Sequence, residues 1–99
     1  MKTKYIIVLI HEEQAKPYVL HTDKRFHENI IERHGCHVTE YLSQAGAKKK
    51  ASQCCKSYTY GKSYAMTYGE LENLEERLQG CYAHGLRSRM IEEFLEERE

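Results

Sequence analysis

The feature that most constrains the fold is a short apolar run near the start of the chain. Every residue from Ile6 to Ile10 is apolar. Successive side chains of a strand point to opposite faces of its sheet, so this run needs cover on both faces. We therefore predict a central strand from Lys4 to His11. The run is too short to span a bilayer or to form the core of a signal peptide, so we expect a cytoplasmic protein with no membrane partner.

The next two segments predict a hairpin and a helix. Glu12 to Lys16 is a short polar connection to a second strand at Pro17 to Thr22, and this length favours an antiparallel hairpin. A helix is predicted from Thr22 or Asp23, either of which can cap it, to His34. Its buried face is expected to carry Phe26, Ile30 and Ile31.

The segment from Cys36 to Lys56 is compatible with a second helix, for which Thr39 is a candidate cap. Apolar and small residues recur there at helical spacing: Ala47, Ala51, Cys54, Cys55 and Tyr58. Gly46 weakens this interpretation because glycine disfavours helix interiors.

The segment from Ser57 to Tyr68 alternates strictly between large and small residues. The large residues are Tyr58, Tyr60, Lys62, Tyr64, Met66 and Tyr68. A period of two favours a strand, or a tight hairpin that turns at Gly61-Lys62. The spacing of four between successive tyrosines from Tyr60 to Tyr68 also permits a helix, so these alternatives stay open.

The last third of the chain predicts one broken helix or two helices. Thr67 and Glu70 have the spacing of a capping box, in which each residue caps the other's backbone. Two apolar series follow, one of Leu71, Leu74, Leu78 and Tyr82, the other of Leu86, Met90, Ile91, Phe94 and Leu95. The break is expected near Gly80 or Gly85. We predict a single α+β domain over residues 1–99, with an antiparallel sheet of about three strands and about three helices.

Charge is distributed very unevenly along a chain whose formal net charge is zero. Residues 41–69 contain five lysines and no acid, which gives about +5. Residues 70–99 contain nine acids and four arginines, which gives about −5, and residues 1–40 are neutral. The middle segment also contains five tyrosines. Lysines with interleaved aromatic rings are typical of surfaces that bind nucleic acid, because ammonium groups contact phosphates and rings stack on bases.

We therefore predict that the basic, tyrosine-rich middle segment binds an acidic macromolecule, either a nucleic acid or a nucleoprotein complex. The predicted contact residues are Lys48, Lys49, Lys50, Lys56, Tyr58, Tyr60, Lys62 and Tyr64. An alternative is internal neutralisation, in which the acidic end of the chain folds against the basic middle.

The residues also allow weaker alternatives for a metal site and for catalysis. A metal site would draw on Cys36, His37, Cys81 and His84, but only Cys81 and His84 have ordinary zinc-ligand spacing. No nucleophile with an assignable base and orienting group is evident, and no glycine-rich phosphate loop is complete. We therefore expect no enzyme activity, no cofactor and no bound metal.

The second apolar series predicts an assembly. A domain this small has one modest core, so the stripe of Leu86, Met90, Ile91, Phe94 and Leu95 is a candidate homodimer surface. Taken together, the sequence favours a small non-enzymatic regulator or inhibitor, similar in size to those of phages and mobile elements. A Cys/His metal-binding module and a small-molecule or nucleotide-binding protein are the alternatives.

Overall fold

The computed structural model describes residues 3–22, 25–27 and 38–98. Within them it has a four-stranded antiparallel sheet in the order β3-β2-β1-β4. The strands are β1 (Tyr5–His11), β2 (Lys16–Leu20), β3 (Phe26–His27) and β4 (Gly61–Thr67). Three helices complete the α+β fold, namely α1 (Gln44–Ser57), α2 (Tyr68–Leu78) and α3 (His84–Arg98). The predicted fold class is confirmed.

The central position predicted for the first strand is also confirmed. β1 pairs with β2 on one side and with β4 on the other. The side chains from Ile6 to Leu9 are completely buried. The predicted hairpin to β2 is present, with Pro17 opposite Ile10.

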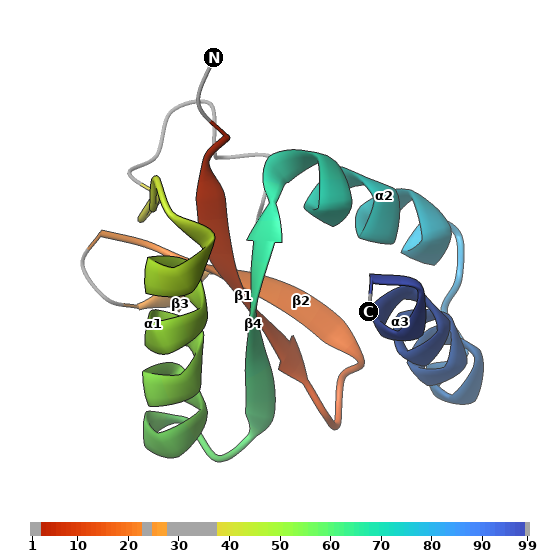
Figure 1. The fold of residues 1–99 in the computed structure, drawn as a ribbon. Coiled ribbons are helices and arrows are strands. Elements are labelled where there is room, and N and C mark those ends of the chain that lie inside the picture. Colours follow the sequence, from red (N-terminus) through yellow and green to blue (C-terminus); the bar gives the residue numbers. More distant parts are fainter. Residues whose placement is uncertain (1–2, 23–24, 28–37, 99) are drawn as a thin grey trace.

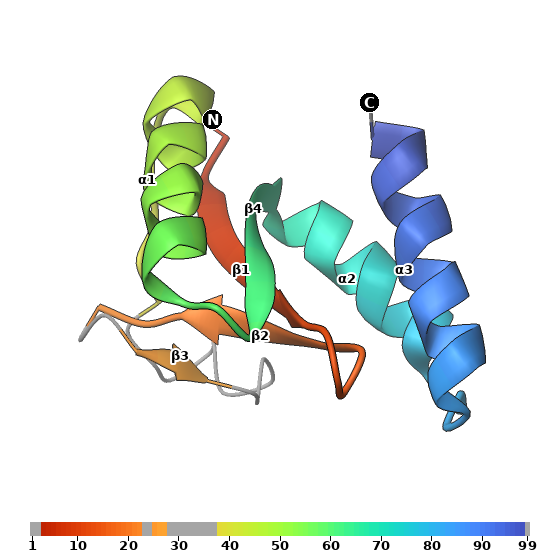
Figure 2. The ribbon, with the colours of Figure 1, turned by 90° about the horizontal axis from the view of Figure 1, so that it is seen from below.

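Helices cover the sheet on both faces, which makes three layers (Figures 1 and 2). Helix α1 lies on one face, where Ala47, Ala51 and Cys54 pack against Ile7 and Leu20. Helices α2 and α3 lie on the other face and build a larger core there. That core includes Ile6, Val8, Met66, Leu71, Leu74, Ile91 and Phe94.

Helix α1 begins later than the sequence suggests. Its N-cap is Ser43, whose hydroxyl accepts a hydrogen bond from the Gly46 N–H at 2.9 Å. The expectation that Thr39 caps this helix is wrong, because the helix begins at Gln44 and Thr39 lies four residues before its cap, where its N–H donates to the Leu20 carbonyl of β2. The predicted inner face is confirmed for Ala47, Ala51 and Cys54. Cys55, one residue further, is exposed.

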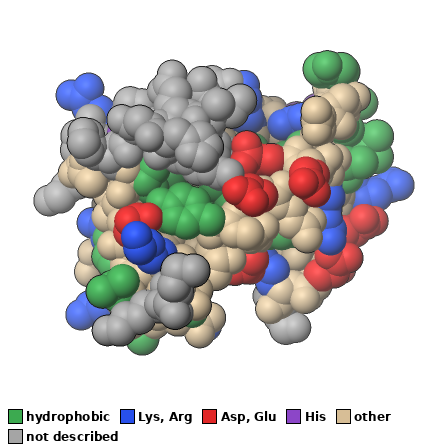
Figure 3. Space-filling view, turned by 90° about the horizontal axis from the view of Figure 1, so that it is seen from above, with side chains coloured by type: hydrophobic (Ala, Val, Ile, Leu, Met, Phe, Trp, Pro, Cys, Tyr) green, Lys and Arg blue, Asp and Glu red, His purple; other side chains and the backbone are tan. Residues whose placement is uncertain are grey.

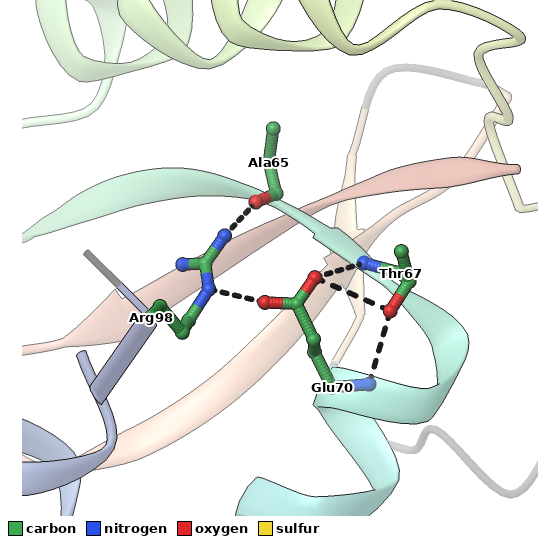
Figure 4. Close-up of polar contacts among 4 residues, drawn as sticks. All are labelled: Ala65, Thr67, Glu70 and Arg98. Atoms are coloured by element: carbon green, nitrogen blue, oxygen red, sulfur yellow. Dashed lines mark hydrogen bonds and ion pairs between the residues drawn. The ribbon is translucent and has the colours of Figure 1, made fainter. Parts of the chain in front are cut away.

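The predicted capping box at the start of α2 is confirmed. The Glu70 N–H donates to the Thr67 hydroxyl at 3.1 Å, and the Thr67 N–H donates to a Glu70 carboxylate oxygen at 3.1 Å. Arg98 of α3 bonds the other carboxylate oxygen of Glu70 and also the Ala65 carbonyl (Figure 4). Burial alone would raise the pKa of Glu70. The Thr67 hydrogen bonds and the Arg98 charge outweigh that effect and hold this pKa below its ordinary value.

The last third of the chain forms two helices rather than one. Helix α2 ends at Leu78, and Gly80 has a φ of 76°, a conformation that favours glycine. Leu71, Leu74 and Leu78 are buried as predicted. Tyr82 lies beyond the helix end and is 90% exposed, so its predicted place on the same apolar face is wrong. None of the described helices has the length and apolar character needed to cross a membrane.

One further expectation is wrong, and one set of open alternatives is decided in favour of a strand. The helix predicted from Thr22 or Asp23 to His34 is wrong at Phe26–His27, which form β3 beside β2. The His21 N–H donates to the Arg25 carbonyl, next to the pairing of Leu20 with Phe26. Asp23, Ile30, Ile31 and the rest of residues 28–37 lie outside the described residues. The alternating segment is one strand over Gly61–Thr67, without a turn at Gly61-Lys62.

Candidate functional site

Five rings form a continuous row, hereafter the aromatic row, on the face of the sheet that α1 covers. Phe26 of β3 meets Tyr58 edge-on, with ring centroids 4.9 Å apart. Tyr58 meets Tyr60 at 5.7 Å, and Tyr60 meets the His11 ring at 5.4 Å. The His11 ring lies 6.1 Å from Tyr18 of β2. Residues from four separate segments therefore supply one row.

The register of the sheet explains where this row lies. Tyr18 pairs with Leu9, and paired residues of neighbouring strands share a face. His11 lies two residues beyond Leu9 and therefore on that face as well. Helix α1 ends at Ser57, with Tyr58 as its C-cap. The row thus continues the cover of the sheet past the end of α1, over the completely buried Leu9.

Tyr60 is the most accessible phenol ring of the row, with 45% of its surface exposed, whereas Phe26, Tyr58, Tyr18 and His11 are partly buried. Partial burial raises the pKa of Tyr60, and the nearby Tyr58 and Tyr18 phenols add to the effect. The Tyr60 hydroxyl is therefore neutral at physiological pH. The row offers aromatic faces and edges together with the neutral Tyr60 hydroxyl.

Hydrogen bonds hold two rings of the row, those of His11 and Tyr18. The backbone N–H of Gln14 donates to His11 Nδ1 at 3.2 Å, and the Tyr18 hydroxyl donates to the Gln14 side-chain carbonyl. The polar β1–β2 turn therefore orients both rings. Side chains held in this way have less conformational freedom to lose when a ligand binds.

Helix α1 brings positive charge to the same face of the sheet. Lys48, Lys49 and Lys56 are exposed on it and Lys50 is partly buried, with Lys56 in the last turn, next to the Tyr58 cap. None of these four lysines forms an ion pair with a residue that the structure describes. They remain available to a partner.

The acidic helices lie on the other face of the sheet. Arg98 pairs with Glu70, and Arg77 pairs with Glu97, so ion pairs join α2 to α3. Viewed from the end where α2 lies, acidic side chains gather mostly over the α2–α3 half (Figure 3). Because the sheet separates these helices from α1, the acidic end does not fold against the α1 lysines. This arrangement argues against internal neutralisation of those lysines, whereas Lys62 of β4 shares a pocket with Glu92 of α3.

The structure brings together only part of the predicted contact set. Lys48, Lys49, Lys50, Lys56, Tyr58 and Tyr60 lie on the α1 face of the sheet. Lys62 and Tyr64 pair with Ile10 and Val8 and so face the α2–α3 side. Tyr64 packs against the core there, while Lys62 is exposed. The strand is shorter than the alternation from Ser57 to Tyr68 suggests, because Tyr58 and Tyr60 precede β4 and Tyr68 begins α2.

Sequence reasoning missed His11, Tyr18 and Phe26 as members of the row. The hairpin register would place His11 and Tyr18 on one face, so two of these members had a usable signal. No such signal was present for Phe26, because its segment was predicted as a helix.

The residues of the alternative metal site are not brought into one cluster in the described part of the chain. Cys81 is buried, and exposed His84 places its Nε2 3.2 Å from the Glu12 carbonyl oxygen. Cys36 and His37 lie outside the described residues. Among residues 3–22, 25–27 and 38–98, no group of three or more Cys, His, Asp or Glu side chains is placed to hold a metal ion.

The apolar stripe of α3 packs largely within its own chain. Ile91 and Phe94 are buried in the α2–α3 core, and Met90 and Leu95 pack partly against it. Only Leu86, 47% exposed, faces mainly solvent. The stripe therefore does not require a second copy for its cover, and the predicted homodimer stays a prediction that sedimentation would test.

Comparisons with protein-family models, with curated proteins and with solved structures find no match. The function is therefore argued from the geometry of the chain itself.

Proposed function

We propose that this protein is a small non-enzymatic binding protein that holds single-stranded nucleic acid on the aromatic row, with the α1 lysines against the phosphates. By occupying a strand, it would act as a regulator or inhibitor of processes that use that strand. The observation that carries the proposal is the row itself, in which exposed Tyr60 lies among four other rings beside a helix whose lysines form no ion pair with a described residue.

The chemistry of the row favours single strands over duplexes. Bases of a single strand are free to stack on aromatic rings, whereas paired bases are stacked on one another. Stacking on a ring contributes about 1–3 kcal/mol per base. The rings come from β1, β2, β3 and the segment before β4, so several bases would find rings along one path.

The separation of charge across the sheet supports the same proposal. A strand on the α1 face meets Lys48, Lys49 and Lys56, while the acids of α2 and α3 lie behind the sheet. Each neutralised phosphate of a single strand adds about −0.7 to the slope of log affinity against log salt. Three lysine contacts predict a slope of about −2.

The direct test measures fluorescence anisotropy of a labelled oligothymidine with the unmodified protein and with Tyr60→Ala. Loss of one stacked base should weaken binding about tenfold. Tyr82→Ala is the matched control, because Tyr82 is 90% exposed and lies outside the aromatic row. The control should bind like the unmodified protein.

Two results would overturn the proposal. One is that the protein binds no single-stranded nucleic acid, even if it binds an acidic protein. The other is equal affinity for the Tyr60→Ala and Tyr82→Ala variants, which would remove the aromatic row from the contact surface.

A further inference from the structure

A groove lies along the free edge of β4, away from the aromatic row. This edge strand lies between α1 on one side and α2 and α3 on the other (Figure 1). The groove has a volume of about 410 Å³. Its lining includes Lys48 and Cys55 from α1, Ser63 and Tyr64 from β4, and Arg98 from α3.

Side chains occupy part of the outward-facing backbone of β4. The Ser63 N–H donates to Cys55 Sγ at 3.2 Å, and the Cys55 thiol donates to the Ser63 carbonyl at 3.5 Å. Arg98 donates to the Ala65 carbonyl, and Glu70 accepts from the Thr67 N–H (Figure 4). These contacts oppose the addition of an extended strand at this edge, because it would need the same groups. The groove therefore suits a small ligand better than a peptide strand.

The two adjacent cysteines differ sharply in access. Cys54 is 4% exposed in the α1 core, and burial raises the pKa of its thiol. Cys55 is exposed and lines the groove. Cys81 is also buried. Among the cysteines that the structure describes, Cys55 is therefore the one that a reagent in solution can reach.

A buried hydroxyl at the same place points independently to a ligand. Ser63 is 6% exposed, and its Oγ has no hydrogen-bond partner among the described residues. Ser63 lines the groove, and the Cys55 thiol bonds both of its backbone groups. A ligand that displaces the Cys55 thiol and brings its own amide would supply hydrogen-bond partners for the backbone groups and the hydroxyl of Ser63. Buried polar groups are rarely left without partners, so such an exchange is favourable.

We propose that Cys55 is a modification site that forms a mixed disulfide with a small anionic thiol of the glutathione class, held in the groove by Lys48 and Arg98. The Cys55 thiol loses its proton to solvent, and its thiolate attacks one sulfur of the oxidised dimer of that thiol. The S–S bond of the dimer breaks as the new bond to Cys55 Sγ forms. The other half leaves as a thiolate.

The charges of the groove set the preference for an anionic thiol. Arg98 already pairs with Glu70, whereas Lys48 has no ion pair with a described residue. Lys48 is therefore the main determinant of the charge preference. The neighbouring Lys49 is also exposed but does not line the groove, which makes it a matched control.

The test follows disulfide exchange by intact mass, with oxidised glutathione as the anionic probe and cystamine as the cationic probe. The unmodified protein should gain one glutathionyl group and should react faster with oxidised glutathione than with cystamine. Cys55→Ser should remove this fast adduct. Lys48→Glu should lower the rate ratio of the two probes by roughly fivefold, and Lys49→Glu should leave it nearly unchanged.

Three outcomes would overturn the proposal: unchanged glutathionylation of Cys55→Ser, a faster reaction with cystamine, or equal effects of Lys48→Glu and Lys49→Glu. Circular dichroism checks that Cys55→Ser is folded. Cys54→Ser provides a second variant, because removal of the buried thiol should leave the adduct in place. Loss of the adduct in Cys54→Ser would also count against Cys55. None of these outcomes depends on nucleic-acid binding.

Discussion

The two faces of the sheet differ in how they are covered. On one face, a single helix packs small residues such as Ala47 and Ala51 against Ile7, and the aromatic row covers the remainder. On the other, two helices bring Leu74 and Phe94 into a larger core. The first face carries α1 lysines that form no ion pair with a described residue, whereas ion pairs join the helices of the second.

This difference separates stability from binding. Large buried side chains and the ion pairs between α2 and α3 stabilise the α2–α3 face. The α1 face buries smaller side chains and keeps rings and ammonium groups accessible. The sheet lies between the two, so the α1 lysines are on one face and the ion-paired helices α2 and α3 are on the other. Four predictions test this division, from the largest expected effect to the smallest.

The largest effect is expected in the core of the α2–α3 face. Phe94→Ala should lower the free energy of unfolding by about 3–5 kcal/mol, because the buried ring leaves a cavity. Leu86→Ala on the same helix is the control, since Leu86 is 47% exposed. It should change stability by no more than about 0.5 kcal/mol. Urea denaturation measures both. Similar losses of stability in the two variants would contradict the burial of Phe94 in this core.

A moderate effect is expected at the start of β4, on the α1 face. A Cβ added at Gly61 would overlap the Ile10 carbonyl group, so Gly61→Ala should cost about 1–3 kcal/mol. Gly85 has no atom within 4 Å of an added Cβ and lies in α3. Gly85→Ala should therefore be neutral or stabilise by up to about 1 kcal/mol. In thermal melts, the midpoint should fall for Gly61→Ala and stay the same or rise for Gly85→Ala. A rise for Gly61→Ala would contradict the close contact of Gly61 with the Ile10 carbonyl group.

A smaller, pH-dependent effect is expected at Glu70. Because the pKa of Glu70 is lowered on folding, its charge contributes stability above the ordinary value of 4.5, and this contribution is lost as the pH falls through the lowered pKa. Glu70→Gln should lower stability at neutral pH by about 1 kcal/mol, a modest value because the ion pair is partly exposed. The difference should disappear in acid.

Denaturant melts across this pH range provide the measurement, with Glu76→Gln as the control because Glu76 is exposed on the same helix. A loss of stability that is equal at acid and neutral pH would show that the Glu70 charge is not the cause.

The smallest effect on stability is expected from the α1 lysines. Replacing Lys48, Lys49 and Lys56 together with Glu should change the free energy of unfolding by less than about 1 kcal/mol, because exposed charges contribute little to folding. The same variant should bind oligothymidine far more weakly, with most of the salt dependence lost. Strong destabilisation would show that the α1 face contributes more to folding than its packing indicates.

Local signals in the sequence predicted several elements correctly. The apolar run at Ile6–Ile10 predicted a central strand because both faces of that strand require cover. The capping box at Thr67 and Glu70 predicted the start of α2, since its hydrogen bonds join residues only three apart. The prediction was wrong at Phe26, where pairing with Leu20 of β2 overrides a helical pattern.

The sequence by itself determined the α+β class, the buried central strand, the inner face of α1 and the concentration of positive charge in residues 41–69. These follow from periodicity, capping and composition, which act over a few residues. Only the tertiary structure decided that the sheet lies between the acidic helices and the α1 lysines, that five rings from distant segments meet, and that Cys55 closes over Ser63. Such contacts depend on strand order and register, which join residues far apart in the chain and leave no local pattern.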